Sequence, residues 1–257
     1  MARRATAIKQ EREKASAERG GASANVLLLD AGNTLFGQPL ADKTRGRVVV
    51  EAMNKLGYDA MALGDHDLNR GVSVVEERAK DAKFPFLSAN VVTAEGQRPV
   101  GKPYTVVTVD GRRIAIIGLS ELMTAFPGGQ QSELVKQDYL TVARDTIEEA
   151  RKETTAVIVL SNLGQAQERE LANKVPGIAV IVGGGSGPRL PQPEIVGDSG
   201  TVIVRTVGNG EELGICKLTL DKDGRAKNVE AKLVTLHQDV FAEDGEMRKL
   251  LDSFQNQ

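Results

Sequence analysis

Short apolar runs that end in glycine and polar residues constrain the fold of this chain more than any other feature. The runs over residues 25–30, 59–63 and 156–160 are continuous rather than alternating, as in strands buried on both faces. Segments with helical apolar spacing separate the runs, over residues 48–56, 72–82, 139–153 and 165–174. This alternation predicts a layered α/β fold.

The two ends of the chain and its hairpins complete this prediction. Residues 3–19 read as a charged helix, and residues 243–254 as a short helix. Further strands are expected at 84–89, 178–182 and 202–207, with hairpins over 104–119 and 213–236. Asp110-Gly111 fits a type I′ turn. Hairpins beside buried strands indicate mixed sheets. We expect an N-terminal helix packed on the domain (1–24), one domain (25–245) and a C-terminal helical tail (246–257).

Composition excludes several classes of function. The 257 residues carry a net charge of −2, and aromatic residues make up 4% with no Trp. A nucleic-acid-binding role is therefore not expected. Cys216 is the single cysteine, which rules out an intrachain disulfide and a cysteine-based zinc site; its apolar neighbours predict that it is buried. The first residues lack the apolar core of a signal peptide, and no run is long enough to insert in a membrane.

Four polar segments follow predicted strands: Asp30-Ala-Gly-Asn-Thr34, Gly64-Asp-His-Asp-Leu-Asn69, Ser161-Asn-Leu-Gly164 and Gly183-Gly-Gly-Ser-Gly187. Their order and spacing resemble the metal-binding blocks of the 5′-nucleotidase family of calcineurin-like metallophosphoesterases. The resemblance runs from about residue 5 to about residue 246 and includes connecting stretches such as 49–64 and 84–91. It implies a four-layer α/β/β/α sandwich with mixed sheets.

The resemblance also implies what the blocks do. In the family, two divalent ions clamp a phosphate ester and a bound hydroxide attacks it in line. The family's first block, Asp-x-His on an opening strand, has no counterpart here, because the chain begins at the helix that follows it. We therefore expect the opening strand to be missing and a sheet edge to be exposed, where a protein partner or a second chain could pair.

The remaining blocks depart from the family pattern at the ligand positions. Asn33 stands where the family has the bridging Asp, Asp65 where it has Asn, and Asn162 where it has His. Gly185, Ser186 and Gly187 replace the family's His-Ser-His, which leaves a glycine-rich loop as the vestige of a substrate-binding segment. The chain has only two histidines, His66 and His237. His237 lies outside every block and is expected at the surface.

Each residue that survives at the site has two interpretations. Asp65 could hold one Mg²⁺, Mn²⁺ or Ca²⁺ ion weakly, or Asn33 and Asp65 could bond each other and the nearby loop amides. His66 matches the family's phosphate-facing histidine, but its partner is Asn69 rather than a carboxylate. It is either a catalytic acid or a vestigial side chain. Asp67 is expected to be a helix cap or a surface carboxylate.

Three functions remain open at this point. The favoured one is a catalytically degenerate domain that serves as a scaffold or binding module, with no resident cofactor. The alternatives are a weak metal-dependent nucleotide hydrolase that uses Asp65 and His66, and a sensor that binds nucleotide or phosphate without cleaving it. A small-molecule ligand is left undecided. The chain itself does not reveal its compartment, and the resemblance implies a periplasmic or extracellular location.

Overall fold

The computed structural model describes residues 1–20, 26–122, 133–198, 200–206 and 210–255. The helices are α1 (Ala2–Glu18), α2 (Pro39–Lys43), α3 (Arg47–Leu56), α4 (Asp65–Leu68), α5 (Val72–Asp81), α6 (Tyr139–Ala150), α7 (Gln165–Lys174) and α8 (Gly245–Gln255). The strands are β1 (Leu29–Asp30), β2 (Ala60–Ala62), β3 (Phe86–Leu87), β4 (Val91–Thr93), β5 (Tyr104–Val109), β6 (Arg112–Leu119), β7 (Leu134–Lys136), β8 (Ala156–Ser161), β9 (Val180–Gly183), β10 (Glu194–Val196), β11 (Thr201–Arg205), β12 (Glu212–Leu220) and β13 (Ala226–Thr235).

Two sheets form the centre of the molecule. The smaller is parallel, with the order β1-β2-β3. The larger has the order β10-β11-β9-β8-β6-β5, in which the four middle strands are parallel and the two edge strands are antiparallel to their neighbours. The hairpin β12–β13 and the pair β4–β7 complete the strands described. The larger sheet is therefore mixed, as predicted, whereas the smaller one is parallel throughout.

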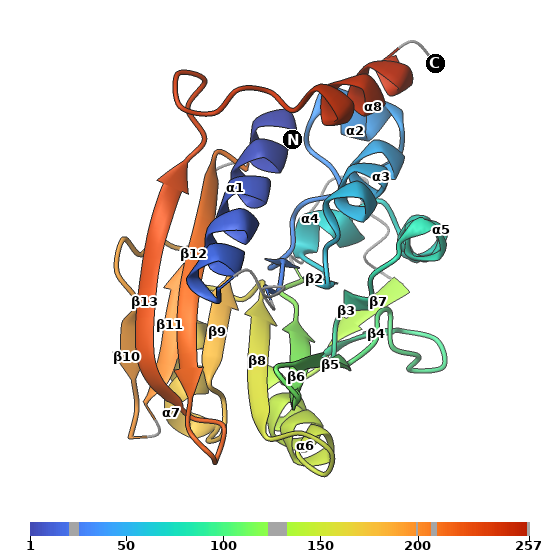
Figure 1. Cartoon of the computed structure of the whole chain (residues 1–257). Helices are drawn as coiled ribbons and strands as arrows, with labels where there is room; N and C mark the ends of the chain where they lie inside the picture. The colour runs from blue at the N-terminus through green and yellow to red at the C-terminus, as the bar shows by residue number, and fades with distance from the viewer. Residues whose placement is uncertain (21–25, 123–132, 199, 207–209, 256–257) are drawn as a thin grey trace.

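The two sheets face each other, and helices cover their outer sides (Figure 1). A cluster that includes Ala62 and Leu87 from the small sheet and Ile116 and Leu160 from the large one fills the space between them. Helices α6 and α7 pack on the other face of the large sheet, and α1, α3, α5 and α8 pack on the small-sheet side. This is the four-layer α/β/β/α arrangement that the family resemblance implies.

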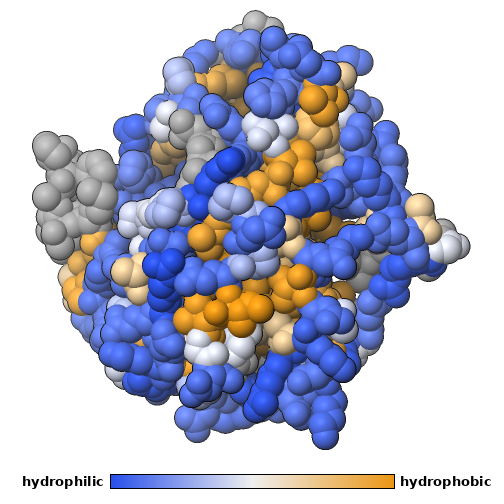
Figure 2. All heavy atoms as spheres, turned by 90° about the vertical axis from the view of Figure 1, so that its left-hand side faces the viewer, coloured by the Kyte–Doolittle hydropathy of each residue, from blue (hydrophilic) through white to orange (hydrophobic). Residues whose placement is uncertain are grey.

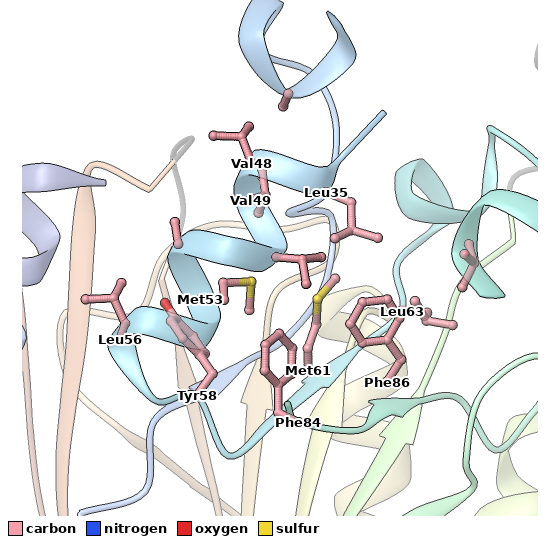
Figure 3. Close-up of a cluster of buried hydrophobic side chains, with 14 of the residues drawn as sticks. Leu35, Val48, Val49, Met53, Leu56, Tyr58, Met61, Leu63, Phe84 and Phe86 are labelled. Atoms are coloured by element: carbon pink, nitrogen blue, oxygen red, sulfur yellow. The ribbon is translucent and has the colours of Figure 1, made fainter. Parts of the chain in front are cut away.

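The small sheet is held in place by the largest apolar cluster (Figure 3). Met53 from α3 and Met61 from β2 are both fully buried within it, and Phe84 and Phe86 pack with their ring centroids 5.8 Å apart. Complete burial of one such side chain contributes about 1.5–3 kcal/mol. This cluster fixes β1 and β2, and with them the polar segments that follow these strands.

Most predicted elements are confirmed, with differences at their ends. The Asp110-Gly111 turn has positive φ at both residues, at 51° and 74°, as a type I′ turn requires. The run at 25–30 is shorter than predicted: β1 has two residues, because the Leu28 amide donates to the Asp59 carboxylate rather than to a main-chain carbonyl. The elements α2, α4, β4, β7 and β10 were not predicted.

Two surface predictions have opposite outcomes. His237 is exposed, as expected. The prediction that Cys216 is buried is wrong: it is exposed, because it borders a cavity between β12 and β1. Among the residues described, no helix combines the length and apolar character needed to cross a bilayer.

Candidate functional site

The four polar segments meet at one edge of the two sheets, as the sequence predicts. They follow β1, β2, β8 and β9, whose carboxyl ends point the same way within each sheet. The amide of Gly184 donates to the carbonyl of Ser161 at 2.8 Å, which joins the third and fourth segments. The side chain of Asn162 joins the third segment to the first by donating to the Ala31 carbonyl at 3.1 Å.

Asn33 and Asn162 hold the second segment from both sides. Asn33 Oδ1 accepts from the amide of His66 at 3.0 Å, and Asn162 Oδ1 accepts from the amide of Asp65 at 3.3 Å. The structure thus brings together all three predicted metal positions. The expectation was that Asn33 and Asp65 bond each other and the nearby loop amides. Asn33 does bond a loop amide, that of His66, whereas the hydrogen bonds of the described residues include none between the Asn33 and Asp65 side chains.

Gly64 makes this arrangement sterically possible. A Cβ atom at this position would lie 2.0 Å from Asn33 Oδ1 and 2.7 Å from Asn162 Oδ1. Any residue with a side chain would push the Asn33 and Asn162 side chains away from the main-chain N–H groups that they bind. Glycine at position 64 therefore leaves the space that the two asparagines need to connect the segments.

Asp67 is the main organiser of the site. Its carboxylate accepts four main-chain N–H groups, from Asn33 at 2.7 Å, Thr34 at 3.0 Å, Leu35 at 2.8 Å and Gly64 at 2.9 Å. The expectation of a helix cap is confirmed, since the Gly64 bond caps α4, but the alternative of a surface position is wrong because Asp67 has no exposed surface. Its short side chain reaches back across the start of α4 into the turn formed by residues 33–35.

Burial shifts the proton affinity of two acids beneath the site. It raises the pKa of Asp67 to about 6, against the lowering effect of the amides of Gly64, Leu35 and Asn33. Burial also raises the pKa of Asp30, whose Oδ1 accepts from the Thr34 hydroxyl at 2.7 Å and from the Gly32 amide at 3.0 Å. Both acids are therefore engaged by donors of the first segment.

Asp65 and His66 supply the acid and the imidazole on which the hydrolase hypothesis depends. His66 Nε2 lies 3.9 Å from Asp65 Oδ2, and the side chains of these residues are 55% and 9% exposed. Only the imidazole is thus open to solvent. The pair has the composition that the hydrolase hypothesis requires.

The Gly183–Gly187 segment is held by an arginine that sequence reasoning missed. Arg205, at the end of β11, donates from Nη2 to the carbonyls of Gly185 and Ser186, the latter at 3.0 Å, and from Nε to Pro188 at 3.3 Å. Its Nη1 pairs with Glu168 of α7, and neither side chain has exposed surface. An arginine ending a strand otherwise made of Thr, Val and Ile was the available signal.

The segment is thus bonded to the protein interior along much of its main chain. The carbonyl of Ser186 also accepts from the Gln165 amide at 3.0 Å. The carbonyls of Gly185 and Ser186 are turned toward Arg205, while Ser186 and Gly187 are exposed to solvent. These contacts give the loop a defined shape that does not depend on a ligand.

The donor set at the three matching positions differs from the ligand set of a two-ion centre. Transition-metal pairs need imidazole and carboxylate ligands, and the three matching positions offer two amides and one acid. The side-chain oxygens of Asn33 and Asn162 each accept a hydrogen bond from a main-chain N–H group. The Asp67 carboxylate accepts hydrogen bonds from four further main-chain N–H groups. Within the described part of the chain, no three His, Cys, Asp or Glu side chains are grouped so that they could hold a metal.

Comparison with known proteins agrees with the fold and with the order of the segments. No protein-family model matches the chain. The human 5′-nucleotidase is 30% identical over 244 aligned residues, covering 85% of this chain and 42% of that protein. Among solved structures, the sulfate thiohydrolase SoxB of Thermus thermophilus superposes with a TM-score of 0.89 at 25% identity, over 99% of this chain and 46% of that one.

A 5′-nucleotidase precursor from Thermus thermophilus superposes with a TM-score of 0.83 at 27% identity, over 99% of this chain and 52% of its own. The fold and the order of the polar segments therefore define a domain of the calcineurin-like phosphoesterase class. This chain is a 5′-nucleotidase-like domain, homologous to the 5′-nucleotidases. It spans about half the length of these relatives.

Proposed function

We propose that this domain is catalytically degenerate and serves as a scaffold or binding module built on the 5′-nucleotidase fold. One observation carries the proposal. The side chains at the matching metal positions bind the protein's own main chain: Asn33 holds the His66 amide and Asn162 holds the Asp65 amide and the Ala31 carbonyl. Their polar atoms therefore already have a structural role.

Charge supports the same proposal. Two adjacent divalent ions carry four positive charges, and Asp65 is the one carboxylate among the three matching positions. Asp67 and Asp30 lie beneath the site, and both bind N–H or O–H donors of residues 32–35. Without a metal pair, the domain lacks the usual means of lowering the pKa of water from 15.7 to near 7.

The Asp65–His66 pair supports a second candidate, a weak metal-dependent phosphoester hydrolase. Here Asp65 would hold one hard cation such as Mg²⁺, and the exposed imidazole of His66 would act as the acid. Two observations weigh against this candidate. Asp65 is only 6% exposed, and its neighbours at the site, Asn33 and Asn162, carry amides rather than acids. No contact among the residues that the structure describes specifically favours a sensor for nucleotide or phosphate.

Hydrolysis of p-nitrophenyl phosphate in excess Mn²⁺ separates these candidates. The proposal expects turnover indistinguishable from that of the His66→Ala variant. Asn33→Asp with Asn162→His, which introduces a carboxylate and an imidazole at the site, serves as the matched gain-of-ligand control and is expected to increase manganese binding. Turnover in the original chain that disappears in His66→Ala would establish the hydrolase instead.

The relationship to the 5′-nucleotidases also supports a location outside the cytoplasm. Fractionation of the source cells tests this part of the proposal. Recovery with cytoplasmic markers would contradict it.

A further inference from the structure

Three Asp-Gly pairs occur in the chain, and the structure describes all of their residues. They are Asp110-Gly111 in the turn between β5 and β6, Asp223-Gly224 in the turn between β12 and β13, and Asp244-Gly245 at the start of α8. Aspartate isomerises readily when glycine follows it, because glycine has no Cβ to shield its main-chain nitrogen. The surroundings of each pair therefore decide whether it reacts.

The isomerisation releases one water molecule and then takes one up. The glycine nitrogen attacks Cγ of the protonated aspartate. A C–N bond forms, the bond from Cγ to the hydroxyl oxygen breaks, and the hydroxyl leaves with the amide proton as water. Water then opens the resulting five-membered ring. Opening at Cγ restores aspartate, whereas opening at the original main-chain carbonyl gives isoaspartate, in which the chain runs through Cβ and Cγ. No oxidant, reductant or other reactant is required.

The Asp110-Gly111 pair is open to this reaction. Both residues are exposed, and a Cβ added to Gly111 would have no atom within 4 Å. Among the hydrogen bonds of the described residues, none is donated by the Gly111 amide. Asp110 has a φ of 51°, a left-handed conformation that is unfavourable for a residue with a Cβ. The attacking nitrogen is thus accessible.

Arg19, which follows α1, restrains the acid of this pair. Its Nη1 donates to Asp110 Oδ2 at 2.6 Å and its Nη2 to Oδ1 at 2.7 Å, so both carboxylate oxygens are engaged. A bidentate guanidinium stabilises the ionised carboxylate and fixes its orientation. Ring formation instead requires the protonated acid with Cγ turned toward the Gly111 nitrogen. Arg19 therefore opposes the reaction, through a pair whose side chains are 46% and 47% exposed.

The other two Asp-Gly pairs are held by main-chain contacts. The Gly224 amide donates to the Asp221 carbonyl at 3.2 Å, and a Cβ at Gly224 would lie 1.7 Å from the Thr155 carbonyl oxygen. Asp244 caps α8, because its Oδ1 accepts from the Met247 amide at 2.8 Å. Ring formation at either pair would break one of these hydrogen bonds. The two pairs are therefore slower references within the same chain.

The Arg19–Asp110 pair is one of several exposed ion pairs that join α1 to other elements. Glu18 pairs with Lys217 of β12 at 2.7 Å, and Glu11 lies 3.7 Å from Lys232 of β13. Figure 2 shows the hairpin side of the molecule, whose surface is mostly hydrophilic apart from a band of apolar side chains. Individual ion pairs at such a surface contribute little to stability. Replacing Arg19 is therefore expected to leave the fold intact.

We propose that Asp110 is a site of spontaneous isoaspartate formation and that its ion pair with Arg19 controls the rate. Isoaspartate lengthens the main chain by one methylene group, which the two-residue turn between β5 and β6 does not accommodate in its present register. It also moves the carboxylate onto Cα, which breaks the present contact with Arg19. The modification thus releases the end of α1 from this turn. Neither residue belongs to the four polar segments, so the inference is independent of the binding role proposed above.

Site-resolved peptide mapping of aged protein tests this proposal. The original chain and Arg19→Ala are incubated at neutral pH for increasing times. Isoaspartate at each Asp-Gly pair is then quantified by liquid chromatography with mass spectrometry, and methylation by protein L-isoaspartate methyltransferase provides a second readout. In the original chain, isoaspartate should accumulate faster at Asp110 than at Asp223 or Asp244. In Arg19→Ala, the rate at Asp110 should rise by about threefold, as expected for the loss of an exposed ion pair, while the other two rates stay unchanged.

Lys14→Ala is the matched control, because it removes a cation of α1 whose ion-pair partner, Glu11, belongs to the same helix. Its rate at Asp110 should equal that of the original chain. Equal rates at Asp110 in the original chain and Arg19→Ala would overturn the proposal, as would faster accumulation at Asp223 or Asp244. A rise at all three Asp-Gly pairs in Arg19→Ala would indicate general loosening of the fold and would also overturn it.

Discussion

Arg205 and Glu168 form an ion pair in which neither side chain has exposed surface. The pair joins the end of β11 to α7, and the same guanidinium binds the carbonyls of Gly185 and Ser186. It therefore determines the position of the glycine-rich loop at the candidate site. Removing one partner of a buried pair leaves the other charge without compensation.

We expect Glu168→Ala to lower the free energy of unfolding by about 3–5 kcal/mol for this reason. Urea unfolding followed by circular dichroism measures the loss. The matched control is Arg169–Glu194, a pair anchored on the same helix but 48% and 28% exposed; Glu194→Ala should cost about 1 kcal/mol or less. Similar losses in the two variants would contradict the structural role of the buried pair.

Asp67→Ala is expected to be among the most destabilising substitutions in the site. It leaves four main-chain N–H groups without their acceptor, beneath a segment that contains the fully buried Leu35. We expect a loss of about 3–5 kcal/mol in urea unfolding. The exposed Asp145 of α6 provides the control, and Asp145→Ala should change stability by about 0.5 kcal/mol or less. Equal effects would show that the four bonds contribute little.

Stability should depend on pH through Asp67. Its pKa is about 6 in the folded protein against 3.8 as the ordinary value, so the folded state binds the proton more tightly. The resulting stabilisation is fully present below 3.8 and is lost as pH rises through 6. The free energy of unfolding, taken as the original chain minus Asp67→Asn, should therefore fall by about 2.4 kcal/mol between pH 4 and pH 7. A difference that rises over this range would contradict the shift.

Gly64→Ala tests the steric requirement beside the two asparagines. Its Cβ would overlap Asn33 Oδ1, so we expect a loss of about 1–3 kcal/mol and faster hydrogen exchange at the His66 amide. Gly245→Ala is the control, because no atom lies within 4 Å of its added Cβ. If both substitutions left exchange at His66 unchanged, the bond from Asn33 would not hold that amide.

Periodicity and strand direction account for what the sequence predicted correctly. The residues of β8 and the helix α6 follow patterns that repeat within one element, so local spacing was sufficient. The meeting of Asn33, Asp65 and Asn162 was implied by the resemblance to the 5′-nucleotidase family, whose metal-binding blocks these positions match. By contrast, Glu168 and Arg205 lie 37 positions apart, and neither position indicates its partner.

Features that depend on how the layers of the fold pack against each other could not be predicted from local sequence patterns. Asp67 could have faced solvent or the turn at residues 33–35, and only the packing of α4 against that turn decides between them. Cys216 lies in an apolar alternation, which predicted burial. It is exposed because its face of β12 borders a cavity rather than a packed layer of side chains.

Isothermal titration calorimetry with Mn²⁺ on the purified, metal-free chain tests the central claim most directly. If Asn33, Asn162 and Asp67 are used to hold the main chain, the titration should show at most one weak site, with a Kd of about 1 mM or weaker. The Asn33→Asp, Asn162→His double variant should bind manganese more tightly than the original chain. Two manganese ions bound per original chain at micromolar concentration would contradict the account.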